Sequence, residues 1–325
     1  MRRREFIAQL GAAVSPTIWP LAARAQQRTQ PIIGFLALGR RLGDDVRLIP
    51  FRQGLKDSGY IEGQNVAIEY RYADGQSDRL PALAADLVRR QVTVIVALGF
   101  APALAAKAAT ATIPIVFEFA GDPVELGFVA SLNRPGGNLT GATSLNVEIA
   151  PKQLELLHEV VPMATVVALL VNSANQPQSE RMTRDAQVAA RSLGLRLHVL
   201  HTNADRDFDA VFATLDQLQA GALIIGAGFL SWAEQLGALT HAVPAMCPYR
   251  EFAAAGGLMS YGTDFSTIYR LVGAYTGRIL KGEKPSELPV QQATKMELVI
   301  NLKTAEPLGL TIPRKLLVLA DQVIE

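Results

Sequence analysis

Short apolar segments alternate with amphipathic segments along almost the whole of this 325-residue chain. Apolar or alternating runs predict strands, and apolar residues that recur every three or four positions predict helices. In the first half we predict strands at 31–38, 65–73, 92–99 and 113–119, and helices at 48–60, 79–90 and 102–110. In the second half we predict strands at 165–172, 195–201 and 221–228, and helices at 180–194 and 208–218. This alternation favours parallel sheets with helices on both faces.

One order of elements occurs twice along the chain. Each half contains a helix that ends at a glycine (Gly59 or Gly194), an alternating strand, a second helix and a strand that is apolar on both faces. A strand of the last kind is typical of the centre of a parallel sheet. We therefore predict an α/β fold of two lobes with one architecture, although sequence identity between the two halves is low.

Segments rich in Pro, Gly and Asn indicate where the chain passes between the lobes. The stretch LNRPGGNLTGATSLN (132–146) suits a crossover rather than a core element. We expect the late segments, which include a long helix and an extended run, to return to the first lobe and cross again to the second. The predicted units are a leader at 1–25, lobe one at 31–143 plus 261–292, and lobe two at 144–260 plus 293–325, with crossovers near 140–146, 258–264 and 289–296.

The first 25 residues have the order of an export signal. Three arginines at 2–4 precede a mildly apolar run that Pro16 and Pro20 interrupt, which does not suit a membrane-spanning helix. Ala23-Arg24-Ala25 supplies the small residues of a cleavage site, and we place cleavage after Ala25. Because Arg3 and Arg4 resemble a twin-arginine signal, we predict a periplasmic protein. Sec export and an uncleaved amphipathic helix stay as alternatives.

Composition and charge exclude some classes of partner. The chain has 31 Lys and Arg against 30 Asp and Glu, a net charge of +1. There is no basic excess to bind nucleic acid, and no block of charge suits a membrane surface. Hydrophobic residues make up 49%, enough for a packed core. Cys247 is the single cysteine, so no intrachain disulfide can form.

The sequence carries no familiar catalytic or metal-binding motif. Cys-x-x-Cys, His-Glu-x-x-His and Gly-x-Ser-x-Gly are absent. His198 and His201 lie three apart in one predicted strand, so they face opposite sides and cannot share a metal ion. Because no nucleophile and base can be paired from the four histidines, we predict no enzyme, no cofactor and no metal. An exported hydrolase-like α/β enzyme is the alternative from another class.

Five stretches of the chain resemble one protein family. They are RREFI…PLAARAQQ, FRQGLKDSGYIEGQNVAIEYRYADGQSDRLPALAADLVRRQV, GDPVELGFVASLNRPGGNLTG, REFAAAGGLMSYGTD and YTGRILKGEKPSELPVQQATKMELVINLKTAEPLGLTIP. They look like bacterial ABC-transporter substrate-binding proteins related to tryptophan and tyrosine uptake binding proteins. The resemblance covers nearly all of the mature chain. It implies a type I periplasmic binding protein fold: two Rossmann-like lobes with parallel sheets flanked by helices, three crossovers and a ligand cleft between the lobes.

The resemblance also implies partners. It predicts a small-molecule ligand, an ABC permease and its ATPase in the inner membrane, and no role for nucleic acid. We expect the protein to act as a monomer. A ligand sensor that feeds a signalling partner instead of a permease is a second alternative.

Loops beyond the carboxyl ends of the predicted strands are the expected ligand site, because parallel sheets bind ligands there. Those loops and the crossovers together nominate Gly39, Arg40, Phe100, Ala101, Asp122, Ser144, Asn172, Phe229, Tyr249, Tyr261 and Asp264. Several of these residues also have structural interpretations. Asn172 could cap a helix, Asp122 could shape a turn, and the aromatic residues could pack in the core or between the lobes.

The expected ligand is a small amphipathic carboxylate, namely an aromatic or branched amino acid or a related acid. Helix starts present N–H groups that suit a carboxylate, and the aromatic residues suit an apolar tail. Asp122 or Asp264 would pair with an amino group, whereas Arg40 and Arg41 would favour a second acidic group. The sequence does not decide between a ligand with an amino group and a ligand with a second acidic group. Many relatives carry a Gly-Gly-Thr-Pro-like turn where this chain has 99–102 as Gly-Phe-Ala-Pro.

Overall fold

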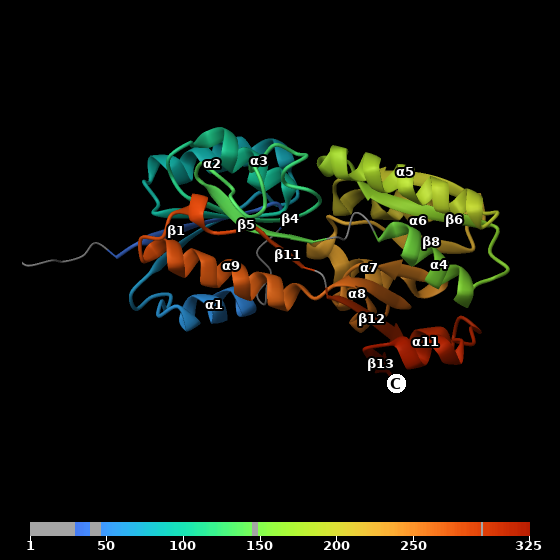
Figure 1. The fold of residues 1–325 in the computed structure, drawn as a ribbon. Helices are drawn as coiled ribbons and strands as arrows, with labels where there is room; N and C mark the ends of the chain where they lie inside the picture. The colour runs from blue at the N-terminus through green and yellow to red at the C-terminus, as the bar shows by residue number, and fades with distance from the viewer. Residues whose placement is uncertain (1–29, 40–46, 145–148, 294) are drawn as a thin grey trace, which may run out of the picture. The chain divides into compact units, whose positions relative to one another are not determined.

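A computed structural model describes residues 30–39, 47–144, 149–293 and 295–325, so the predicted leader and Arg40 lie outside the described residues. The strands form two sheets (Figure 1). The first sheet has the order β11-β5-β4-β3-β1-β2 and comprises β1 (Ile32–Ala37), β2 (Ala67–Tyr72), β3 (Val94–Leu98), β4 (Ile115–Ala120), β5 (Leu139–Ser144) and β11 (Gln291–Ala293). All of its paired strands are parallel.

The second sheet has the order β13-β12-β10-β9-β8-β6-β7. It comprises β6 (Val166–Asn172), β7 (Arg196–Thr202), β8 (Ala222–Ile225), β9 (Ala245–Cys247), β10 (Met259–Thr263), β12 (Met296–Asn301) and β13 (Gln322–Ile324). Its described pairs are parallel except β10 with β12. Two mostly parallel sheets flanked by helices are the α/β architecture that the alternation predicts.

Helices cover both faces of the first sheet (Figure 1). They are α1 (Leu48–Asp57), α2 (Leu80–Arg89), α3 (Phe100–Ala109) and α9 (Phe265–Leu280). The central strand β3 is buried on both sides, as its continuous apolar run predicts. Val94 and Val96 share one core cluster with apolar residues of α1 and α9, whereas Ile95 and Ala97 share another with those of α2 and α3.

The second sheet is also covered on both faces. Its helices are α4 (Ala150–Val160), α5 (Gln176–Ser192), α6 (Phe208–Leu218), α7 (Ala233–Leu239), α8 (Arg250–Ala254), α10 (Leu302–Ala305) and α11 (Arg314–Leu319). Leu169 of β6 and Ile224 of β8 share a cluster with apolar residues of α4 and α5. Leu170 and Ile225 belong to the cluster that includes α6, α7 and α8. The alternation along each strand therefore divides the core into two layers.

The chain passes between the two sheets three times. It leaves the first sheet after β5, returns from β10 through α9, and leaves again between β11 and β12. Helix α9 packs on α1 and on β3, β4 and β5, so a late segment completes the first lobe. β10 belongs to the second sheet as far as Thr263. The lobe boundaries given above stay a prediction.

Helices α1 and α9 approach closely through glycines. A Cβ atom on Gly54 of α1 would lie 1.9 Å from the Arg270 carbonyl oxygen, and one on Gly273 of α9 would lie 2.0 Å from the Phe51 carbonyl oxygen. Real Cβ atoms do not approach backbone so closely, so the absence of a side chain permits this contact. The two glycines thus let α9 pack closely against α1 of the first lobe, where the apolar residues of both helices are buried.

The prediction that 132–146 is a crossover rather than a core element is wrong for Leu139–Ser144. These residues form β5, which is buried along its whole length between β4 and β11. Gly141 has no side chain because its backbone lies close to β4: a Cβ on Gly141 would lie 2.0 Å from the Phe117 carbonyl oxygen. Thr140 satisfies its hydroxyl by donating to the Leu288 carbonyl oxygen at 2.7 Å. Tertiary pairing here overrides a weak local strand preference.

Two helices begin earlier than predicted. Helix α3 starts at Phe100 rather than Pro102, and α5 starts at Gln176 rather than at residue 180. A proline fits the first turn because the N–H groups there have no acceptor within the helix. Pro102 and Pro177 both lie in the first turn of their helices. A proline therefore indicates where the first turn lies, but the helix can begin one or two residues before it.

Candidate functional site

A cavity lies beyond the carboxyl ends of strands from both sheets. The first sheet contributes residues at the ends of β1, β3 and β4, and the second contributes the start of α5 and the loops after β8 and β9. The space between atoms measures about 850 Å³, open solvent included. Parallel sheets bind ligands at this edge, so the cavity is the candidate site.

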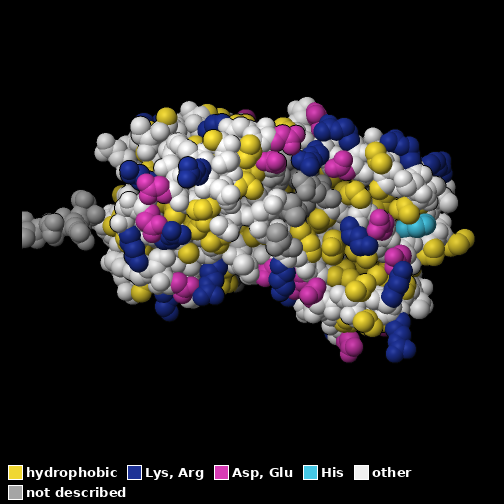
Figure 2. Space-filling model, viewed as in Figure 1, with side chains coloured by type: hydrophobic (Ala, Val, Ile, Leu, Met, Phe, Trp, Pro, Cys, Tyr) yellow, Lys and Arg dark blue, Asp and Glu magenta, His cyan; other side chains and the backbone are white. Residues whose placement is uncertain are grey.

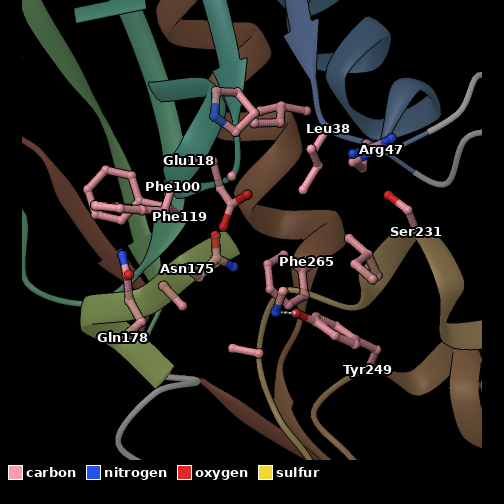
Figure 3. A pocket seen from close by; sticks show the side chains of 18 of the residues that line it. Leu38, Arg47, Phe100, Glu118, Phe119, Asn175, Gln178, Ser231, Tyr249 and Phe265 are labelled. Carbon is pink, nitrogen blue, oxygen red and sulfur yellow. Dashed lines mark hydrogen bonds between the residues drawn. The ribbon is translucent and has the colours of Figure 1, made fainter. Parts of the chain in front are cut away.

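Glu118 places a carboxylate in this cavity from the end of β4 (Figure 3). The residue is 4% exposed. The Tyr269 hydroxyl lies 3.4 Å from its Oε2 atom, at the long limit of a hydrogen bond. Burial raises the pKa of Glu118 to about 7, and the nearby Arg47 charge and the Tyr269 contact oppose this rise without cancelling it. The site therefore holds a carboxylate whose ionised form is poorly compensated.

The N-terminal turn of α5 brings amide side chains to the other side of the cavity. Asn175 and Gln178 reach in from this turn (Figure 3). Gln178 is 7% exposed, and neither its Nε2 nor its Oε1 atom has a hydrogen-bond partner. A buried amide without partners costs free energy unless something else bonds it. Gln178 therefore offers both a donor and an acceptor to an occupant of the cavity.

Aromatic rings form much of the cavity wall. Phe100 meets Phe119 edge to face at 5.8 Å, on the side of the first sheet. Phe265 of α9 lies 5.4 Å from Tyr249, which follows β9 of the second sheet, and 5.5 Å from Tyr269 of α9, measured between ring centroids. Rings arranged in this way offer apolar faces to a ligand of similar character.

The two lobes contact each other at the cavity and farther from it. Gly39 of the first lobe lies so near Ser231 that a Cβ on Gly39 would be 2.3 Å from the Ser231 hydroxyl oxygen. Farther along, Arg181 of α5 donates to Glu125, in the loop after β4, at 3.1 Å. An ion pair this exposed contributes about 0–1 kcal/mol, so we assign it a small part in holding the lobes together.

The structure brings three of the nominated residues to the cavity: Gly39, Phe100 and Tyr249 all line it. Tyr249 is held in place because its hydroxyl accepts the Gly228 N–H at 2.8 Å. Burial raises the pKa of Tyr249, so the hydroxyl is neutral. These three residues stay candidates for ligand contact.

Other nominated residues have structural contacts of their own and do not line the cavity. Asp122 accepts the Val124 and Glu125 N–H groups, and Asp264 caps α9 by accepting the Ser266 N–H and the Thr267 hydroxyl. Asn172 accepts the Ala174 N–H and donates to the Gly228 carbonyl oxygen.

The remaining candidates are also placed away from the cavity lining. Phe229 is fully buried between Phe208 and Trp232, and Tyr261 lies in β10 against the core of the second lobe. Ser144 is buried in β5. Ala101 follows Phe100 in α3 and is half-buried.

The sequence argument missed Glu118 and Gln178. It assigned the strand IPIVFEF (113–119) and nominated the loop after it, so the acid inside the strand was passed over. The signal was present: Glu118 is a lone acid near the carboxyl end of an otherwise apolar strand. Gln178 gave a weaker signal, because the predicted start of its helix lay two residues farther along.

A second hollow lies beside α5. It is lined by polar residues, among them Ser173, Thr183, Arg184 and His201. Its described lining has no Phe, Tyr or Trp side chain, so it offers less to an apolar ligand than the cavity between the sheets. Within the described ranges, no group of three or more His, Cys, Asp or Glu side chains is placed to hold a metal ion. The same ranges contain no helix long and apolar enough to cross a membrane.

Comparisons with known proteins agree with this geometry. The model of a family described as ABC transporter substrate binding protein matches residues 46–324. A tyrosine-binding protein of Clostridioides difficile is 24% identical over 298 residues, covering 88% of this chain and 83% of that protein.

Solved structures share the fold. A conserved domain protein from Vibrio cholerae has a TM-score of 0.80 and 27% identity, with 90% of this chain and 99% of that chain covered. An ABC domain from Streptococcus pneumonia, solved in complex with L-Trp, has a TM-score of 0.79 and 24% identity, with 91% and 100% covered. More distant neighbours include periplasmic binding proteins. The predicted type I periplasmic binding protein fold is confirmed.

Proposed function

Because this chain belongs to the family of ABC transporter substrate-binding proteins, we propose that it binds a small amphipathic carboxylate and delivers it to an ABC permease and its ATPase. The family is one of binding proteins and not of enzymes. The observation that carries the proposal is the cavity at the carboxyl ends of both sheets, where aromatic walls surround a few buried polar groups. Such a mixture is usual in sites for small molecules.

The cavity favours an aromatic or branched amino acid, or a related acid, over a sugar. A sugar needs many hydrogen bonds, whereas most of this lining is apolar. Phe100, Phe119 and Phe265 suit a ring or branched tail. The amide of Gln178 has a free donor for a carboxylate oxygen. The binding of tyrosine and L-Trp by two relatives supports the same class of ligand.

The proposed place of action is the periplasm, as for other proteins that supply such permeases. The order of charged, apolar and small residues in the first 25 positions supports export, and Arg3 and Arg4 favour the twin-arginine route. Lys and Arg side chains are mixed with Asp and Glu over the face seen in Figure 2, as expected without a nucleic-acid partner.

Mass spectrometry of the exported protein checks this proposal. The expected mature chain begins at Gln26, and replacing Arg3 and Arg4 by Lys should block export if the twin-arginine route is used. An intact chain that retains Met1 in the cytoplasm would contradict export.

The fluorescence of Trp232 tests the ligand class. Trp232 lines the cavity, and the other tryptophan, Trp19, lies in the predicted leader. Titration with L-tyrosine, L-phenylalanine, L-leucine and glucose, checked by calorimetry, should give saturable binding of at least one amino acid and none of glucose. Replacing Phe100 by Ala should weaken the binding of an aromatic ligand by about 1–2 kcal/mol. Tight binding of glucose alone would contradict the proposal.

A further inference from the structure

We propose that Glu118 makes this cavity select ligands that carry a protonated amine, so that an α-amino acid binds and the same acid without its amino group is rejected. The inference rests on the proposed function and deepens it, because it names one of the two classes that the sequence leaves open. It assigns to Glu118 a role in specificity that the sequence argument gave to Asp122 or Asp264.

The first argument is the surroundings of the carboxylate. Glu118 is 4% exposed, and its hydroxyl contact with Tyr269 is long at 3.4 Å. Removing a carboxylate from water costs several kcal/mol unless charge and hydrogen bonds compensate it. Arg47 compensates in part, yet burial still dominates the balance at Glu118. A ligand ammonium would complete the compensation by a charge-assisted hydrogen bond.

The second argument is that the competing acids are engaged elsewhere. Both oxygens of Asp264 accept hydrogen bonds at the start of α9, and Asp122 accepts two backbone N–H groups in an exposed turn. Among the described residues that line the cavity, Glu118 is the one acid. A ligand amine inside the cavity therefore has one carboxylate to meet.

The third argument is the polarity of the cavity along its length. Glu118 enters from the end of β4, whereas Gln178 enters from the first turn of α5 (Figure 3). Gln178 keeps an unbonded donor and an unbonded acceptor, and it carries no charge. The two groups together complement an ammonium and a carboxylate, with aromatic rings between the lobes for the side chain of the ligand.

The proposal carries a dependence on pH. The charged or titratable groups that face Glu118 are Arg47 before α1, Tyr249 after β9 and Tyr269 of α9. Burial keeps Tyr249 neutral, and a guanidinium stays charged throughout this range. Because the pKa of Glu118 is about 7, binding of an ammonium should release a proton at neutral pH. Affinity should fall by up to about tenfold between pH 8 and pH 6.

The test compares four amino acids with the same acids lacking the amino group. The pairs are L-tryptophan with indole-3-propionate, L-tyrosine with 3-(4-hydroxyphenyl)propionate, L-phenylalanine with 3-phenylpropionate and L-leucine with 4-methylpentanoate. Calorimetry on the whole mature chain should show the best amino acid binding about 100-fold more tightly than its partner. In Glu118→Gln this ratio should fall below about tenfold, and the dependence on pH should vanish.

Asp122→Asn is the matched control. It also removes one carboxylate near the cleft, but Asp122 is exposed and outside the cavity lining, and asparagine can still accept its N–H bonds. This variant should keep the preference of the wild type. If Glu118→Gln does not fold, the ligand pairs and the pH series measured on the wild type still test whether the cavity prefers a ligand with an amino group.

The outcomes separate the two proposals. Equal affinity of the wild type for both members of a pair, or an unchanged ratio in Glu118→Gln, overturns the inference and leaves the proposed function standing. If no member of any pair binds, the ligand class of the proposed function fails, and the inference fails with it.

Discussion

Replacing Gly273 by alanine is expected to lower the free energy of unfolding by about 3 kcal/mol, because α9 would be forced away from α1. The new Cβ would lie 2.0 Å from the Phe51 carbonyl oxygen and 2.9 Å from the Leu55 nitrogen, both of which are backbone atoms that cannot rotate aside. In a helix without this contact the same change would stabilise by about 1 kcal/mol. A loss of stability in Gly273→Ala therefore indicates the close approach of the two helices, and a gain would indicate its absence.

Unfolding in urea measures this effect. Gly54→Ala, on the facing helix, should behave similarly, because its Cβ would lie 1.9 Å from the Arg270 carbonyl oxygen. Ser266→Ala is the control, since Ser266 is exposed in the first turn of α9. A Gly273→Ala protein as stable as the wild type would show that the two helices do not pack as described.

Replacing Glu118 by glutamine is expected to stabilise the ligand-free protein by about 3 kcal/mol near pH 8 and not at all near pH 4. Burial raises the pKa of Glu118 from 4.5 to about 7. The folded state therefore holds a proton that the unfolded state loses. The protonated Glu118 contributes all of this stability below pH 4.5, the pKa of the residue in the unfolded chain. The contribution is lost as the pH rises through about 7, so the buried charge destabilises the protein at high pH.

Urea unfolding of both proteins across this pH range checks the prediction, and the difference between the two isolates Glu118 from other titrating groups. Glu125→Gln is the control: Glu125 is exposed and paired with Arg181, so its effect should stay below about 1 kcal/mol at every pH. Equal stability of wild type and Glu118→Gln at both ends of the range would mean that water reaches the carboxylate without a ligand.

Much of the architecture could be predicted because local patterns and tertiary needs agree. The run at 92–99 is apolar on both faces, and β3 is buried on both faces in the middle of its sheet. Leu48, Phe51 and Leu55 share a predicted helix face, and all three are buried in α1. In such segments the burial that stabilises the fold uses the same periodicity that the sequence displays.

Strand β5 could not be predicted because its composition depends on its packing against β4, a strand that local sequence patterns do not reveal as its neighbour. Gly141 and the residues around it form a poor strand by composition, and Gly141 is required because the backbone of β4 lies against it. The prediction of the acidic site residue was wrong for a related reason. Asp122 and Asp264 follow strands in the sequence, but both side chains bond local N–H groups. Glu118, hidden within an apolar strand, is the acid that reaches the cavity.

A crystal structure of the mature chain with the amino acid that binds most tightly tests the central claim most directly. The account predicts the ligand between the two sheets, with its ammonium nitrogen within about 3.2 Å of a Glu118 carboxylate oxygen and its side chain against the aromatic walls. Density for the ligand in the hollow beside α5, near Thr183 and His201, or an ammonium turned away from Glu118, would contradict it.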